Sequence, residues 1–236
     1  MALCIVLLAW MVLREEVEAE PFVSLAQRIE SGKTVDPNYV IDLADTVLAF
    51  PQDGRCASQT VKAGLTILLK RLDTLDPKAQ APAFFEALAQ TRAYVDHALA
   101  CTPADGNLWL RRAMISLAEG RNPELVRADM ERSHRFAPAE QKVLGGRFAV
   151  WNRLPITELS RSTPVLLADL KVICRSPDFM IKLPKASASL ERFLDAQAQR
   201  TKQTVQTKPV AKVRRNDQTG RKEGPGLWCE QLSLPN

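Results

Sequence analysis

The chain has 236 residues, an apolar fraction of 46% and a formal net charge of +5 at pH 7, which is enough for one large domain or for a domain with tails. The mild positive charge permits contact with anionic lipid or acidic protein, but it does not indicate binding to nucleic acid. Ala, Leu, Arg, Glu and Gln dominate the middle of the chain, and this composition predicts helices rather than strands.

The first apolar run, MALCIVLLAWMVL, covers residues 1–13 and ends at Arg14 and Glu15. As a helix it would span about 20 Å at ~1.5 Å per residue, which is shorter than the roughly 30 Å hydrocarbon core of a bilayer. We interpret it as a membrane anchor whose start lies upstream of Met1. The alternatives are an ordinary core helix and a signal peptide cleaved after the small-residue pattern of Val17–Ala19. Because no basic cluster follows the run, we expect an inner-membrane protein with a periplasmic body.

Four predicted helix starts share one pattern, a capping residue followed by proline: Asp36–Pro37, Asp76–Pro77, Asn122–Pro123 and Thr163–Pro164. The capping side chain accepts a hydrogen bond from an unpaired N–H, and proline at the first helical position loses no hydrogen bond. Further helices are predicted from Ser58 and Ala83. Apolar residues follow these starts at helical spacing, and the predicted inward faces include Val40, Ile41, Ala44, Val47, Leu48, Val61, Leu65, Leu68, Leu69, Leu72, Phe84, Leu88, Thr91, Val95, Ala98 and Leu99.

The predicted helix ends carry proline or glycine, at Pro51, Gly54, Pro103, Gly106, Gly120, Pro138, Pro155 and Pro177. No alternating strand of useful length interrupts the series. Short helices joined by short turns favour an all-α fold of antiparallel helix pairs.

Between Pro103 and Pro138, large and small residues alternate at intervals that resemble a tetratricopeptide repeat, a 34-residue helix–turn–helix unit. Trp109 occupies the large position of the first helix, Ala113 its small position, and Gly120 the turn. After a one-residue insertion at Arg121–Asn122, the second-helix packing positions hold Val126, Met130 and Ser133, and the apolar stripes that would face each other also include Leu117 and Leu125. Ser116 and Val126 depart from the family pattern, which has an aromatic residue and Ala there.

Weaker matches on both sides extend the resemblance from Ala83 to Arg175. It implies a short tetratricopeptide-like solenoid of stacked antiparallel helix pairs, of about three units. The predicted organisation is an N-terminal anchor or signal-like segment (1–19), capping helices (20–76), repeats (77–175), a C-terminal helical segment (176–199) and a disordered basic tail (200–236). An electrostatic tether to lipid headgroups or another polyanion is the functional alternative for the tail.

No convergent catalytic motif is present in the sequence, so we predict that the protein is not an enzyme and needs no cofactor or metal. His97 and His134 have no Cys or carboxylate in a ligand pattern and no nucleophile for a triad, and we predict that both lie on helix surfaces or in packing. The five scattered cysteines include no CxxC pair, which favours buried or free thiols. One bridge, such as Cys56 to Cys101, is the alternative in an oxidising compartment.

The first helices of successive tetratricopeptide units line a concave binding surface, and the resemblance places five partner-binding residues there: Asn107, Leu110, Arg111, Met114 and Lys142. The predicted function is therefore a membrane-anchored scaffold that binds another protein. The phrase DGNLWLRRAMISLAEG behind an anchor also resembles accessory proteins of bacterial surface-polysaccharide assembly, which implies a role in cell-envelope or exopolysaccharide assembly. The alternative is a non-catalytic substrate platform or accessory subunit of a polysaccharide-handling enzyme.

Overall fold

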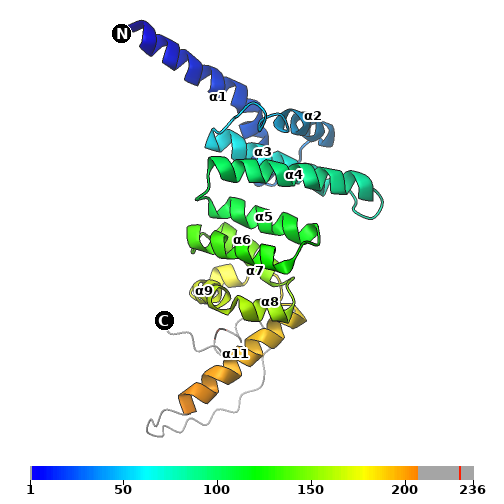
Figure 1. Ribbon diagram of the computed structural model, residues 1–236, viewed down its shortest axis with the longest axis vertical. Helices are drawn as coiled ribbons and strands as arrows, with labels where there is room; N and C mark the ends of the chain where they lie inside the picture. The colour runs from blue at the N-terminus through cyan, green and yellow to red at the C-terminus, as the bar shows by residue number, and fades with distance from the viewer. Residues whose placement is uncertain (1, 207–228, 230–236) are drawn as a thin grey trace. The chain divides into compact units, whose positions relative to one another are not determined.

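The computed structural model describes residues 2–206 and Cys229 (Figure 1). All regular secondary structure in this part of the chain is helical, in eleven helices without a strand, which confirms the all-α prediction. The predicted tail, 200–236, lies outside the described residues except for Cys229 and the end of the last helix, which continues to Gln206. The predicted C-terminal segment 176–199 contains a four-residue helix and the first part of this last helix.

The chain divides into two compact units, one reaching to Leu108 and the other beginning at Trp109. The boundary lies inside helix α5 (Gly106–Ala118) and therefore within the predicted repeat region. Each unit has its own buried residues and is described by itself.

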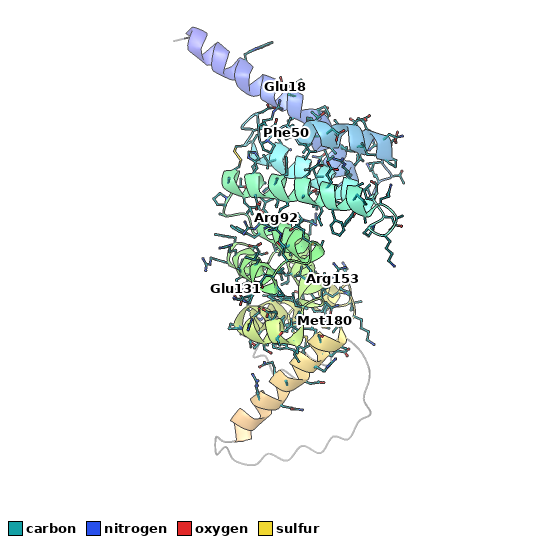
Figure 2. The ribbon with its side chains drawn as sticks, turned by 45° about the vertical axis from the view of Figure 1, so that its right-hand side comes forward. Glu18, Phe50, Arg92, Glu131, Arg153 and Met180 are labelled. Atoms are coloured by element: carbon teal, nitrogen blue, oxygen red, sulfur yellow. A yellow bond between two sulfur atoms is a disulfide. The ribbon has the colours of Figure 1, made fainter. Side chains whose placement is uncertain are left out.

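The first unit contains α1 (Ala2–Glu30), α2 (Pro37–Val47), α3 (Ser58–Asp73) and α4 (Ala81–Cys101). Helix α3 contacts the other three, and Figure 1 shows it beside α4. Three aromatic side chains join the elements: the rings of Phe22 and Phe50 meet edge to face at 5.0 Å, and the Phe50 ring lies 6.4 Å from that of Tyr94. Figure 2 labels Phe50. The Tyr94 hydroxyl donates to the Val61 carbonyl at 3.2 Å, and burial raises the pKa of this phenol.

Helix α1 runs without a break through the predicted boundary between residues 19 and 20. Its second half contributes Phe22, Leu25 and Ala26 to the core of the first unit. None of the described helices combines the length and the apolarity that crossing a bilayer requires.

Two of the predicted caps are confirmed. Asp36 Oδ1 accepts from the Asn38 N–H and Asn122 Oδ1 accepts from the Glu124 N–H, each at 2.9 Å. The start at Asp76–Pro77 is wrong, because Asp76 Oδ1 accepts from the Lys78 N–H in a turn and α4 begins only at Ala81. Such side chain-to-backbone bonds stabilise turns as readily as helix starts.

The start at Thr163 is confirmed, but its capping role is wrong. Helix α9 (Thr163–Cys174) begins there, yet the Thr163 hydroxyl donates backwards to the Ser160 carbonyl at 2.7 Å.

Of the predicted helix ends, Gly54 and Gly120 have positive φ of 66°, whereas Pro177 begins a helix instead of ending one. Proline fits that first position because its missing N–H has no helical partner there.

The inward faces are confirmed where residues lie in the middle of a stripe and wrong at its edges. Val40, Ala44 and Val47 of α2 are buried, whereas Ile41 is exposed, as is Leu125 of α6. A neighbour in sequence is rotated by 100° around the helix axis, since the helix has 3.6 residues per turn. An apolar residue beside a buried one therefore reaches the core only when another helix covers that side too.

The second unit begins with the part of α5 from Trp109 and continues with α6 (Pro123–Phe136), α7 (Gln141–Trp151), α8 (Ile156–Arg161), α9, α10 (Pro177–Met180) and α11 (Ala188–Gln206). Helices α5 and α7 approach closely at Gly146. A Cβ added to this glycine would lie only 2.5 Å from Leu110 Cδ2. Three residues of the resemblance, Ala113, Val126 and Met130, are fully buried in the core of this unit.

Two disulfides join segments that are distant in sequence, Cys56 to Cys101 in the first unit and Cys174 to Cys229 in the second. The expectation of free thiols is therefore wrong for these four cysteines, and the alternative pairing of Cys56 with Cys101 is confirmed. These two meet because the start of α3 lies beside the end of α4, with a Cα–Cα distance of 5.3 Å. Figure 2 draws disulfides as yellow bonds.

Candidate functional site

The five predicted partner-binding residues are distributed over both units. Asn107 lies in the first unit, where its backbone N–H is capped by Asp105 Oδ1 at 2.9 Å, and the other four lie in the second. Leu110 is only 2% exposed and belongs to the core, so the expectation that it contacts a partner is wrong. The cause lies 36 residues away, because Gly146 leaves a space on α7 that the Leu110 side chain fills.

Arg111 and Met114 are half-buried on α5, and Lys142 is exposed in the first turn of α7. The thioether side chain of Met114 packs partly against the core of the second unit. The partner-binding role of these three residues stays a prediction.

Trp109 has surroundings different from those expected for the large residue of a helix pair. Its ring is half-buried, and two guanidinium groups lie over it: Arg112 Cζ is 4.4 Å from the ring centroid and Arg132 Cζ is 4.6 Å from it. A cation over the face of an indole is attracted by the negative potential of the ring. Trp109 therefore stacks with two arginines between α5 and α6 and is not a fully enclosed core residue.

The Asp129 carboxylate holds both arginines. Arg112 donates from Nε to Oδ2 at 2.9 Å and from Nη2 to Oδ1 at 2.6 Å, and Arg132 donates from Nη1 to Oδ1 at 3.2 Å. Asp129 is buried, whereas the Arg132 side chain is 45% exposed. We call these four residues, Trp109, Arg112, Asp129 and Arg132, the tryptophan–arginine cluster. Its formal charge is +1, and it presents an indole and guanidinium groups at the surface of the second unit.

A second bidentate Arg–Asp pair lies in the interior of the same unit. Arg147 of α7 donates from Nε to Asp169 Oδ2 at 2.9 Å and from Nη2 to Oδ1 at 2.8 Å. Trp151 Nε1 donates to Oδ2 at 3.0 Å, and His134 Nδ1 lies 2.8 Å from Oδ1, where it donates because a carboxylate oxygen accepts. Arg147 and Asp169 are 0% and 1% exposed. The carboxylate thus receives four hydrogen bonds from α6 and α7.

Two opposing effects act on the Asp169 carboxyl. Burial raises its pKa, while the hydrogen bonds from His134, Arg147 and Trp151 and the charge of Arg147 lower it. The stabilising contacts together outweigh burial, and the pKa lies below the ordinary value. Arg147 also donates to the Ala137 carbonyl at 2.9 Å and to Ser133 Oγ at 3.3 Å, so this enclosed network ties three helices together.

The two Arg–Asp pairs occupy equivalent places in two helix pairs, α5–α6 and α7–α9. Arg147 follows Arg112 by 35 residues, the same interval that separates Pro138 from Pro103. The residues three before, one after and four after each aspartate are all fully buried: Val126, Met130 and Ser133 around Asp129, and Leu166, Leu170 and Ile173 around Asp169. The 35-residue interval between the arginines is the signal in the sequence that could have found these pairs.

Both histidines have specific partners, one distant in the sequence and one only four residues away on the same helix. His134 contacts Asp169 across 35 residues, and His97 Nε2 lies 3.7 Å from Cys101 Sγ. Of the described residues, Cys56, His97 and Cys101 form a group whose potential ligand atoms all lie within 4.8 Å of one another. Because the two sulfur atoms are bonded to each other in the disulfide, this group could hold a metal ion only in its reduced form.

The chain was compared with protein-family models, curated protein sequences and solved structures, and it matches none of them.

Proposed function

We propose that this protein is a helical-repeat scaffold of the cell envelope that binds a protein partner through the tryptophan–arginine cluster. One observation carries the proposal: two helix pairs share the same bidentate Arg–Asp contact, but of the two only the first has a tryptophan ring lying under guanidinium groups, one of them exposed, whereas the tryptophan of the second, Trp151, is fully buried. At the equivalent places the second pair has Leu144, which is fully buried, and Val172. Tryptophan and arginine are the residues most enriched among those that dominate binding energy at protein interfaces.

The repeated construction supports a tetratricopeptide-like arrangement. Besides the arginine interval, α4 and α6 end alike, with cap residues Thr102 at φ −135°, ψ 71° and Ala137 at φ −141°, ψ 63°, each followed by proline. Helix α8 is an insertion between the two helices of the second pair, which departs from the family pattern. A repeat of this kind buries one face of each helix and leaves another for binding.

The partner that fits the cluster is an acidic peptide segment or a chain end with a free carboxylate. The guanidinium is planar and has five N–H donors, so it binds a carboxylate in a bidentate manner. Indole adds a flat apolar face beside it. Arg111 of α5 and Lys142 of α7 add positive charge on the same unit.

The two disulfides support an oxidising compartment, because such bonds persist in the periplasm or outside the cell and are rare in the cytosol. We place the body in the periplasm, held at the inner membrane by the N-terminal apolar segment, and connect it with envelope or exopolysaccharide assembly through the fainter sequence resemblance. Fractionation of the full chain tests this placement: recovery in the cytosolic fraction contradicts it.

Binding is tested with the full chain and immobilised peptides that end in acidic or in neutral residues. Arg132→Glu reverses the most exposed charge of the cluster, and Lys182→Glu, an equal charge change at an exposed position of the same unit, is the matched control. We expect Arg132→Glu to weaken binding of acidic peptides by roughly tenfold or more, since an attraction becomes a repulsion, and Lys182→Glu to leave it nearly unchanged.

Equal binding by both variants contradicts the proposal. A parallel measurement with an acidic polysaccharide tests the alternative function, a substrate platform. If the protein binds the polysaccharide but not the peptides, and this binding depends on Arg132, the substrate platform is the correct function and the protein scaffold is not.

A further inference from the structure

The Cys56–Cys101 disulfide lies beside a histidine in the first unit. Cys101 is the last residue of α4, and His97 lies one turn earlier on the same helix face, because residues four apart are neighbours on a helix. Cys56 stands two residues before α3. The potential ligand atoms of the three residues lie within 4.8 Å of one another, with His97 Nε2 at 3.7 Å from Cys101 Sγ.

The histidine ring is held by the backbone of the loop that carries Cys56. His97 Nε2 lies 2.8 Å from the Arg55 carbonyl oxygen. A carbonyl only accepts, so Nε2 carries the proton and donates it in the disulfide form. In this form the two sulfur atoms are bonded to each other and offer no thiolate.

We propose that reduction of the Cys56–Cys101 disulfide converts this cluster into a zinc site, with the two thiolates and the His97 imidazole as ligands. A dithiol reductant supplies two electrons and two protons and is itself oxidised to a disulfide, and the two cysteines become thiols. Zn²⁺ then displaces both thiol protons into solvent. The imidazole stays neutral, since Nδ1 takes up a proton from solvent while Nε2 releases its own and turns from Arg55 to the metal. Water completes a tetrahedral set of nitrogen, sulfur and oxygen ligands, which suits zinc.

Access and support both favour this chemistry. Cys56 is exposed, so a reductant can reach its sulfur, and exposed disulfides are the more easily reduced class. Contacts other than the disulfide hold the loop before α3: the Arg55 guanidinium lies 5.0 Å from the centre of the Phe50 ring and pairs at 3.5 Å with Glu18 of α1, which Figure 2 labels. The Tyr94–Val61 hydrogen bond joins α4 to α3. The three ligands therefore stay near one another after the sulfur–sulfur bond is broken, and zinc replaces one tie between α3 and α4 by another.

The second disulfide gives a control within the same chain. Among the described residues, Cys174 and Cys229 belong to no group of three potential ligands. A variant with Cys174→Ser and Cys229→Ser removes this bridge and retains the proposed site, whereas Cys56→Ser with Cys101→Ser removes both thiolates.

The experiment uses the full chain, reduced with a phosphine, and measures zinc by competition with a coloured chelator together with the melting temperature. We expect the reduced protein to bind one equivalent of Zn²⁺, and we expect this zinc to restore most of the decrease in melting temperature that reduction causes. The oxidised protein should not bind zinc, and zinc should not change its melting temperature. Cobalt in place of zinc is expected to give the near-ultraviolet absorption of thiolate-to-metal charge transfer.

The Cys174/Cys229 double variant is expected to behave as the wild type, and the Cys56/Cys101 double variant to lose binding. His97→Gln is expected to keep the disulfide and the fold in the oxidised protein. It should weaken zinc binding on the order of tenfold or more, because even outer contacts of metal sites affect affinity by that factor. The proposal is overturned if the reduced wild type binds no zinc, or if His97→Gln binds it as tightly as the wild type.

Discussion

The two helix pairs of the second unit, α5–α6 and α7–α9, are joined by the same bidentate Arg–Asp contact. In the first pair the arginine side chains reach the surface, whereas in the second pair the whole contact is enclosed. Beside Asp129, the exposed Arg132 lies over the half-buried Trp109 ring, whereas the fully buried Trp151 and the half-buried His134 donate to Asp169. The neighbouring residues, not the Arg–Asp pair, decide whether a repeated contact becomes an exposed cationic surface or part of the core.

The difference also determines how much each pair can tolerate. Both aspartates are buried, so each would retain an uncompensated charge without its arginines. Asp129 has a second guanidinium, Arg132, and its Arg112 is partly exposed, whereas the Arg147 that holds Asp169 is fully buried. The first pair should therefore tolerate the loss of one arginine better than the second.

The largest expected effect follows from removing the enclosed arginine. Arg147→Met leaves Asp169 buried without its bidentate partner, and we expect a loss of about 3–5 kcal/mol in the free energy of unfolding. The matched change Arg112→Met leaves Asp129 with Arg132, and we expect a smaller loss of about 1–3 kcal/mol. Urea denaturation of both variants measures the difference. Equal losses of unfolding free energy would mean that the two Arg–Asp pairs are equally important for stability.

A second comparison uses the residues at equivalent positions beside the arginines. Leu144→Ala removes a fully buried side chain and should cost about 2–5 kcal/mol. Trp109→Ala removes a half-buried ring that mainly supports two guanidinium groups, and we expect about 1–2 kcal/mol. If thermal or urea unfolding shows Trp109→Ala to be the more costly change, Trp109 is a core residue and the proposed binding surface is lost.

The smallest expected effect is a dependence of the unfolding free energy on pH that the enclosed pair produces. The folded-state pKa of Asp169 is lowered, so its contribution to stability is present above the unfolded value, near 3.8, and is lost as pH falls through the lower folded value. We expect the difference in unfolding free energy between the wild type and Asp169→Asn to be constant from pH 5 to 7. Below roughly pH 4 this difference should become smaller. A difference that stays constant into acid contradicts the lowered pKa.

The helices and their buried stripes are local, and the sequence alone determined most of them. The capping oxygens of Asp36 and Asn122 act within two residues, and the positive φ of Gly120 ends α5 at the predicted place. Ala113, Val126 and Met130 are buried as their helical spacing predicts. Each of these signals depends on hydrogen bonds or side-chain periodicity within a few turns, so no knowledge of distant segments is needed.

Only the tertiary structure decided which residues of this unit remain at its surface. Leu110 is buried because Gly146, 36 residues away, leaves room for it, and Trp109 meets Arg132 because α6 packs beside α5. The His134–Asp169 contact and the Cys174–Cys229 bridge likewise join segments separated by tens of residues. Such contacts depend on the crossing of particular helices, and that crossing results from the packing of many side chains at once, which the pattern of any single helix does not contain.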